Sequence, residues 1–144
     1  MTAKEYLLQV RRASIAKKHC EERLDELRAQ AGGLRAITYD KDKVQVSPSD
    51  VLMESVVKLI SMEEEYAEQL VRCHRTILRI TDQINKLPNP DHSEILRLRY
   101  LTPDKYGRLP SMKRIARLTN RSIDRTVHLH GEALRAFWSK YLRQ

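Results

Sequence analysis

Apolar residues recur through the first third of the chain in alternating steps of four and three. The positions are Tyr6, Val10, Ala13, Lys17, Cys20, Leu24, Leu27, Ala31 and Leu34. This is the a/d seam of a heptad repeat with one polar member, and it predicts an amphipathic helix that lies along another helix. Thr2 and Glu5 have the spacing of a capping box, so the helix should begin at Thr2. Gly32-Gly33 should end it, and we expect a loop from Arg35 to Val46.

A longer segment then repeats the same rhythm. Its seam positions are Leu52, Val56, Leu59, Glu63, Tyr66, Leu70, Cys73, Ile77, Ile80, Ile84 and Leu87. Ser47 and Pro48 form a helix start and Asp50 supplies an acid in the first turn. The pattern predicts a helix from Ser49 to Lys86, roughly 55 Å long at 1.5 Å per residue.

A helix of that length with one narrow apolar stripe must lie along another helix. Folding back onto the first helix gives an antiparallel hairpin, and one register places Cys20 beside Cys73 and Tyr6 near Leu87. The same seam in a second copy would give a homo-oligomer. The pattern allows both arrangements.

Two prolines mark a boundary after the second helix. Pro88 and Pro90 each remove a backbone donor and bias the preceding residue away from the helical region. The four residues from Asp91 to Glu94 then resemble a capping box that restarts a helix. In that helix we expect Ile95, Leu98 and Leu101 to be buried on one face, and Arg97 and Arg99 to stay at the surface.

The last third of the chain predicts a short helix, a turn and a longer helix. The first should bury Met112, Ile115, Ala116 and Leu118. Thr119-Asn120-Arg121 breaks the pattern with a residue that tolerates the left-handed conformation, and Ser122 can cap the next helix. That helix should bury Thr126, Leu129, Ala133 and Phe137. The arrangement is typical of a helix-turn-helix, whose second helix can enter the DNA major groove.

These elements predict an all-α protein. We expect a long antiparallel helical hairpin, or coiled-coil arm, over residues 1–87, and a three-helix helix-turn-helix module over residues 91–144.

The distribution of charge favours DNA binding over a helical hairpin that binds nothing. From Asp91 onward there are 12 Lys and Arg residues against 5 Asp and Glu residues, and before it there are 15 against 14. The net charge of +8 therefore lies almost entirely on the segment with the helix-turn-helix pattern. Binding to phosphates needs such a local positive field.

Individual side chains can be given roles on this hypothesis. We expect Asp124, Arg125 and His128 to face base edges, because Arg can bind guanine and Asp can accept from the amino group of cytosine. Ser122 should cap its helix close to a phosphate. Four cations should grip phosphates without reading sequence: Lys113, Arg114, Arg117 and Arg121.

Other polar residues have simpler interpretations. His130 falls on the core-facing side of its helix and should be a packed, hydrogen-bonded histidine. Residues 102–110 are best interpreted as a connector, although Lys105, Tyr106 and Arg108 are placed to touch a DNA backbone. Glu63, Glu64, Glu65 and Glu68 are a solvated acidic face, because no histidine stands among them at ligand spacing.

The sequence predicts no enzyme, metal or cofactor. Cys20 and Cys73 are far apart and form no CxxC motif, so reduced core residues are favoured over a disulfide. No nucleophile, base and orienting group have the spacing of a catalytic set, and there is no Gly-rich phosphate loop. No apolar run is long enough for a membrane span and no signal pattern is present, so we expect a cytoplasmic protein.

Three short strings carry a resemblance to a known family. They are the opening Met1-Thr2-Ala3-Lys4-Glu5-Tyr6-Leu7, the run Ile95-Leu96-Arg97-Leu98-Arg99-Tyr100-Leu101, and Leu129-His130-Gly131-Glu132-Ala133-Leu134. With Arg114-Ile115-Ala116 and Arg121-Ser122, they resemble a phage and prophage family related to the ArpU/RinA-type late transcription regulators. The C-terminal module of that family is similar to region 4 of sigma-70 factors. The chain departs from the family in residues 102–110, which are inserted, and in Met112, which replaces an aromatic residue.

The resemblance implies a bacterial, phage-encoded regulator of late genes that binds double-stranded DNA. The similarity to a sigma factor module also implies host RNA polymerase as a possible partner. Two alternatives stay open: a DNA-recognition component of phage packaging similar to a small terminase subunit, and a coiled-coil adaptor that binds an acidic protein.

Overall fold

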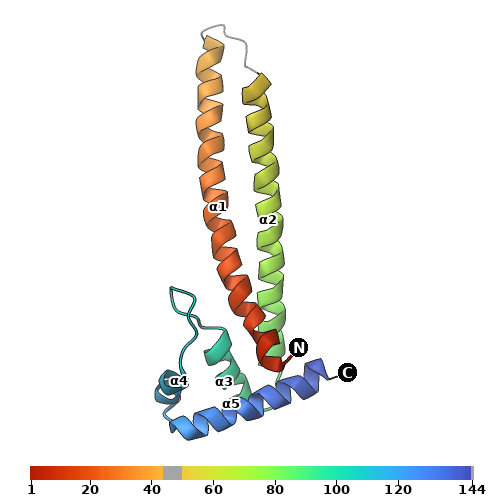
Figure 1. Ribbon diagram of the computed structural model, residues 1–144, viewed down its shortest axis with the longest axis vertical. Coiled ribbons are helices and arrows are strands. Elements are labelled where there is room, and N and C mark those ends of the chain that lie inside the picture. Colours follow the sequence, from red (N-terminus) through yellow and green to blue (C-terminus); the bar gives the residue numbers. More distant parts are fainter. Residues whose placement is uncertain (44–49, 144) are drawn as a thin grey trace. The chain divides into compact units, whose positions relative to one another are not determined.

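The described part of the chain is entirely helical. The computed structural model describes residues 1–43 and 50–143, with the side chains of 34–43 and 51 excepted. Within these ranges there is no strand. The elements are α1 (Ala3–Lys43), α2 (Asp50–Asn85), α3 (Pro90–Tyr100), α4 (Met112–Thr119), α5 (Ile123–Phe137) and a π-helical turn η1 (Trp138–Leu142) (Figure 1). The prediction of an all-α protein with a helical hairpin and a helical module is confirmed.

The chain divides into two compact units. The first consists of Met1–Ile15 and His74–Gln144, and the second is Ala16–Cys73. The boundary that we placed between residues 87 and 91 therefore falls inside the first unit. The reason is a shared core: Ile80, Ile84 and Leu87 are buried together with residues of α1, α3 and α5.

The start of α1 follows the prediction and its end does not. The backbone N–H of Thr2 donates to Glu5 Oε2 (2.7 Å) and the N–H of Glu5 donates to Thr2 Oγ1 (3.1 Å), which is a capping box. The expected stop at Gly32-Gly33 is wrong, because α1 continues to Lys43. A glycine ends a helix by turning left-handed, and the only described glycine with positive φ is Gly107. Inside a helix each glycine costs only about 1 kcal/mol relative to alanine.

The loop expected from Arg35 to Val46 is likewise wrong for Arg35 to Lys43, which belong to α1. Its last three residues lie outside the described part of the chain. The expected start of the second helix at Ser47, Pro48 and Ser49 lies outside the described residues, and α2 is described from Asp50.

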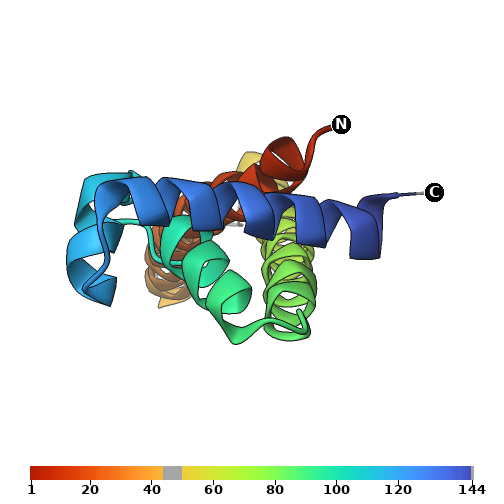
Figure 2. The same ribbon diagram turned by 90° about the horizontal axis from the view of Figure 1, so that it is seen from below.

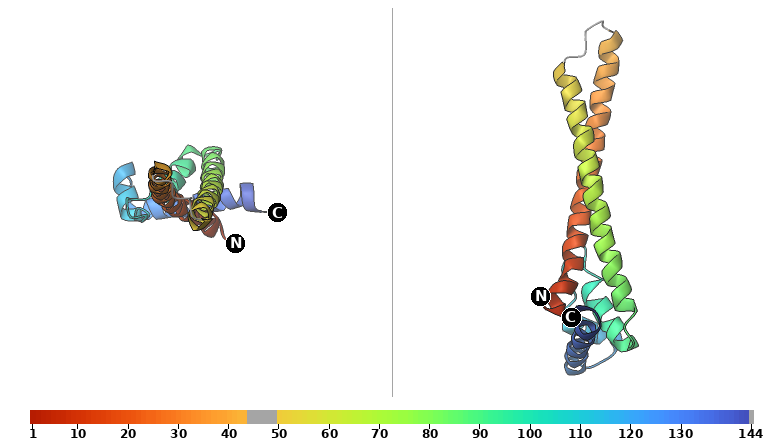
Figure 3. Two further views of the ribbon diagram at one scale, coloured as in Figure 1. Left: turned by 90° about the horizontal axis from the view of Figure 1, so that it is seen from above. Right: turned by 90° about the vertical axis from the view of Figure 1, so that its right-hand side faces the viewer.

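In the second unit α1 and α2 run side by side in opposite directions (Figure 3). Cys20, Leu24, Leu27 and Ala31 are buried on α1, as the heptad pattern predicted. Polar contacts between the described parts of the two helices include Cys20 Sγ, which donates to Gln69 Oε1 (3.6 Å), and Arg28 Nε, which donates to Glu63 Oε1 (3.0 Å). Burial, with a contribution from the nearby Cys73, raises the pKa of the Cys20 thiol, and both cysteines are free.

In the first unit the two ends of the hairpin helices join the C-terminal helices in one core. Ala3, Leu7 and Val10 of α1 are buried, and the hydroxyl of Tyr6 donates to Gln83 Oε1 (2.9 Å) on α2. Helix α5 lies across α3 in this unit (Figure 2). The fully buried core side chains include Tyr100 and Phe137, and the Phe137 ring contacts Tyr6 and Tyr141 with centroids 5.7 and 5.0 Å away.

The start of α3 differs from the predicted capping box at Asp91. The cap is Asn89, whose side chain accepts from the N–H of Asp91 (2.9 Å), and Pro90 occupies the first turn. Ser93 is buried and donates its hydroxyl to the Ile84 carbonyl (2.9 Å). A cap one residue before a proline is preferred because the proline needs no partner for an N–H.

Several side chains of α3 and α4 depart from the predicted burial. Leu98 and Met112 are half-buried where we expected core residues, and Leu96, for which we made no such prediction, is fully buried. Arg99 is half-buried and donates to the Pro110 carbonyl, where we expected a surface residue. Leu118 is 61% exposed, where we expected a core residue. Helix α4 buries Ile115 and Ala116, and Leu118 lies outside the stripe that they define.

The core can be tested at Phe137. Changing Phe137 to Ala removes a fully buried ring and should lower the free energy of unfolding by about 3–5 kcal/mol. Changing Leu118 to Ala at an exposed position should alter it by about 0.5 kcal/mol or less. Urea unfolding followed by circular dichroism measures both, and equal effects of the two substitutions would contradict their difference in burial.

Candidate nucleic-acid interface

The turn between α4 and α5 has the geometry of a helix-turn-helix. Asn120 adopts the left-handed conformation (φ 55°, ψ 42°), as the sequence predicted, and is the only described non-glycine residue with positive φ. The N–H of Arg121 donates to the Ala116 carbonyl (2.9 Å) and closes the end of α4. Ser122 then caps α5 by accepting from the N–H of Arg125 (3.1 Å). The predictions of a left-handed turn at Asn120 and of an N-cap at Ser122 are confirmed.

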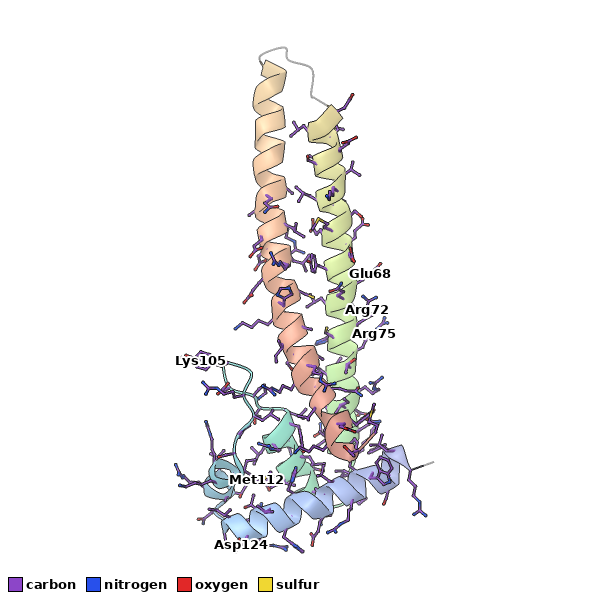
Figure 4. All side chains as sticks on the ribbon, viewed as in Figure 1. Glu68, Arg72, Arg75, Lys105, Met112 and Asp124 are labelled. Carbon is purple, nitrogen blue, oxygen red and sulfur yellow. The ribbon has the colours of Figure 1, made fainter. Side chains whose placement is uncertain are left out.

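The buried side of α5 decides which residues face outward. Thr126, Leu129, Ala133 and Phe137 are 0–2% exposed, as predicted. The opposite side carries Asp124, Arg125 and His128, all exposed. Figure 4 shows Asp124 at the beginning of α5, at the outer edge of this part of the molecule. The three residues expected to face base edges therefore lie together on one accessible turn and a half of helix.

Helix α4 supplies an exposed cationic surface. Lys113, Arg114 and Arg117 are exposed, and in the described chain neither they nor Arg125 take part in an ion pair. Their charges are available to an external anion. Hydrogen bonds from the backbone N–H groups of Arg108 and Tyr106 lower the pKa of Asp104, and the charges of Arg108 and Arg114 lower it further.

Arg121 is placed differently from the other predicted phosphate ligands. Its Nη2 lies 3.0 Å from Asp91 Oδ1 and 3.8 Å from Glu94 Oε2, and its side chain is 23% exposed. Among the described residues, the buried Nη1 has no hydrogen-bond partner. Two carboxylates of α3 thus hold Arg121 against the turn, so this residue is the least available of the set to a phosphate.

A carboxylate on α5 lies close to two histidines. Glu132 Oε1 lies 2.9 Å from His128 Nε2 and Glu132 Oε2 lies 3.6 Å from His92 Nε2. His128, one turn before Glu132, thus contacts this carboxylate while its side chain stays 62% exposed. Sequence reasoning missed Glu132, although its spacing of four residues from His128 was a signal.

His130 is the packed histidine that its position predicted. Its Nε2 lies 2.9 Å from the hydroxyl of Tyr100, and the two rings stack with centroids 5.7 Å apart. Burial, helped by the charges of Arg99 and Lys4, lowers the pKa of His130 to about 4. The ring is therefore neutral and structural at neutral pH.

Residues 102–110 form an ordered loop beside α4. Asp104 Oδ1 accepts from the backbone N–H groups of Tyr106 and Arg108 (both 2.8 Å), and Arg11 Nε donates to the Gly107 carbonyl (2.6 Å). Gly107 has φ 76°, and a Cβ there would meet Ile15 at 3.3 Å. At the exposed tip the cations of Lys105 and Arg108 lie 5.0 and 5.1 Å from the centre of the Tyr106 ring.

The outer surface also contains apolar side chains that the sequence did not reveal. Ile123 and Val127 on α5 are 48% and 50% exposed, beside the polar face, and Leu118 is exposed on α4. Helical spacing left them ambiguous, because residues at the edge of a buried stripe can turn either way.

Comparisons of this chain with protein-family models, curated proteins and solved structures give no match. Among the described helices, none is long and apolar enough to cross a membrane. The described residues also contain no group of three or more His, Cys, Asp or Glu side chains suited to a metal.

The left-handed turn offers a direct test. Changing Asn120 to Gly should keep or slightly raise stability, whereas Asn120→Val should lower the free energy of unfolding by about 1–2 kcal/mol, because a β-branched side chain resists positive φ. Thermal and urea unfolding of both variants measure the difference. Equal stability of the two variants would contradict the turn geometry.

His130 should make stability depend on pH. Its pKa is depressed in the fold to about 4, from 6.5, so the unfolded chain binds a proton first as pH falls. Its contribution is therefore present above about pH 6.5 and is lost as the pH falls from there towards 4.

The variant His130→Gln should lack this step when the free energy of unfolding is measured between pH 7.5 and 4. Changing the exposed His19 to Gln serves as the matched control. An unchanged pH profile in His130→Gln would show that His130 is not a buried neutral ring.

Proposed function

We propose that this protein is a sequence-specific double-stranded DNA-binding transcriptional regulator. The carrying observation is the exposed row of Asp124, Arg125 and His128 on α5, next to exposed cations on α4 that make no ion pair in the described chain. A helix-turn-helix with this distribution suits insertion of α5 in the major groove. On the resemblance of its terminal strings, the regulated genes are phage or prophage genes, and late genes in particular.

Base reading would fall to the first turns of α5. Arg125 can make a bidentate contact with guanine O6 and N7, and Asp124 can accept from the N4 amino group of cytosine. Val127 is also exposed in the first turns of α5. It would offer an apolar side chain to the methyl group of a thymine. His128 contacts Glu132 through Nε2, and its Nδ1 would be the ring nitrogen that meets a base edge.

The part of the DNA affinity that does not depend on base sequence would come from α4 and from the start of α5. Lys113, Arg114 and Arg117 supply positive charge, and each phosphate that they neutralise releases condensed counterions. The N-terminus of α5, capped by Ser122, adds free backbone N–H groups and the positive end of a helix dipole. The net charge of +7 on residues 91–144 supports the same assignment.

Arg125 tests the reading of bases. Sites selected from random duplex DNA should define a preferred sequence, and Arg125→Ala should cost about 1–3 kcal/mol on that sequence and much less on others. Arg79→Ala, an exposed arginine on α2, is the control. An unchanged sequence preference in Arg125→Ala would remove α5 from the reading of bases.

Lys113 and Arg117 test the binding of phosphates. Changing either to Ala should weaken binding to all duplexes alike and reduce the slope of log K against log salt by about 0.9 for each phosphate that is no longer neutralised. Fluorescence anisotropy at several salt concentrations measures the slope. A weakening confined to one sequence would instead indicate base contact, and no binding even in dilute buffer would exclude the proposed function.

A further inference from the structure

The connection between α3 and α4 is longer than the joining of two helices requires. Helix α3 ends at Tyr100 and α4 begins at Met112, which leaves eleven residues between them. Helices that pack together are commonly joined by about 2–8 residues. The interpretation of residues 102–110 as a connector therefore does not account for their exposed end. We call residues 104–108 the loop tip.

The loop tip is held in place by the protein itself. Asp104 Oδ1 accepts from the N–H groups of Tyr106 and Arg108 (both 2.8 Å), and the Asp104 N–H donates to the Arg108 carbonyl (2.8 Å). Arg11 Nε on α1 donates to the Gly107 carbonyl (2.6 Å) and fastens the tip from its other side. Because the loop is already ordered, it loses little conformational freedom when its side chains bind a ligand.

The side chains of the loop tip continue the cationic surface of α4. Lys105 and Arg108 are exposed, and Tyr106 is 67% exposed with both cations close to its ring. From Lys105 to Arg117 the sequence contains five Lys and Arg residues and no Asp or Glu. A run of this kind along one surface suits a polyanion better than a small acidic group.

A hollow of about 310 Å³ joins the loop tip to α4. Arg108 of the tip and Arg114 of α4 both line it. Asp104 lines it too, but its Oδ1 is occupied by two backbone N–H groups and its Oδ2 lies 3.6 Å from Arg108 Nε. Figure 4 shows Lys105 at the end of the loop, at the same edge of the first unit as Met112 at the start of α4.

We propose that the loop tip binds the phosphate backbone of duplex DNA beside the segment that α5 reads. The inference rests on the proposed function, because insertion of α5 in the major groove would lay the DNA along α4 and the loop. Lys105 and Arg108 would each neutralise a phosphate, a contact that positions the protein without reading sequence. The ring of Tyr106 would hold the two cations together through cation–π contacts.

Two double variants with the same change in net charge test the proposal. Lys105→Ala with Arg108→Ala removes the cations of the loop tip, and Lys58→Ala with Arg79→Ala removes two exposed cations of α2. On a long duplex that contains the selected site, the loop variant should reduce the slope of log K against log salt by about 0.9 for each lost phosphate contact. The α2 variant should keep the wild-type slope. Circular dichroism checks that both variants are as helical as the wild type.

Shortening the duplex locates the contact. On a duplex trimmed to the base pairs whose preference Arg125→Ala abolishes, the loop variant and the wild type should bind alike, because the flanking phosphates are absent. Hydroxyl-radical footprints on the long duplex should show protection outside those base pairs in the wild type and not in the loop variant. An equal loss of affinity on both duplexes would overturn the placement of the loop tip beside the segment that α5 reads.

Tyr106 separates a positioning role from a direct one. Tyr106→Phe keeps the ring and should retain the wild-type salt slope, whereas Tyr106→Ala should lower the slope towards that of the loop variant. An equal loss in both Tyr106 variants would overturn the role given to the ring.

Failure of this inference differs from failure of the proposed function. A wild-type protein that binds no duplex would exclude the proposed function and the inference with it. If the wild type binds DNA and the loop variant has the same slope and footprint as the α2 variant, only the inference is overturned.

Discussion

The arrangement of the candidate interface depends on which side of α5 is buried. Thr126, Leu129, Ala133 and Phe137 pack against the core of the first unit, and this fixes the rotation of the helix about its axis. Because the remaining side must face outward, Asp124, Arg125 and His128 become accessible together. The hydrophobic effect has no preferred direction. Because the apolar side chains lie on one face of the helix, however, burying them determines which face points outward.

Capping gives that helix a defined beginning. Ser122 accepts a hydrogen bond at the start of α5, and Asn120 takes the left-handed conformation that ends α4 at Thr119. Arg121 lies between them and is held by Asp91 and Glu94 of α3. The residues that shape the turn are thus occupied within the protein, whereas the cations of α4 and the first turns of α5 are left to an external ligand. The proposal of DNA binding rests on this division.

The hairpin helices have two different tasks in the two units. In the first unit the beginning of α1 and the end of α2 complete the core that supports α5, through side chains such as Leu7 and Ile84. In the second unit they bury only a narrow seam. No residue of α2 from Leu52 to Cys73 is fully buried there. A helix pair has too few layers to cover a long helix on every side, which is why apolar residues such as Val57 remain exposed there.

The sequence alone determined the helical rhythm, the caps at Thr2 and Ser122, the left-handed Asn120 and the buried stripe of α5. These depend on neighbours within one or two turns, so local chemistry is sufficient to specify them. It could not place Leu118 or Arg99, because side chains at the edge of a stripe turn in or out according to what lies opposite. It misjudged Gly32-Gly33, since glycine permits a helix to end without requiring it. Only the tertiary structure joined Arg121 to Asp91, Glu132 to His92, and the ends of α1 and α2 to the C-terminal core, because each of these contacts joins separate elements whose mutual placement no local pattern encodes.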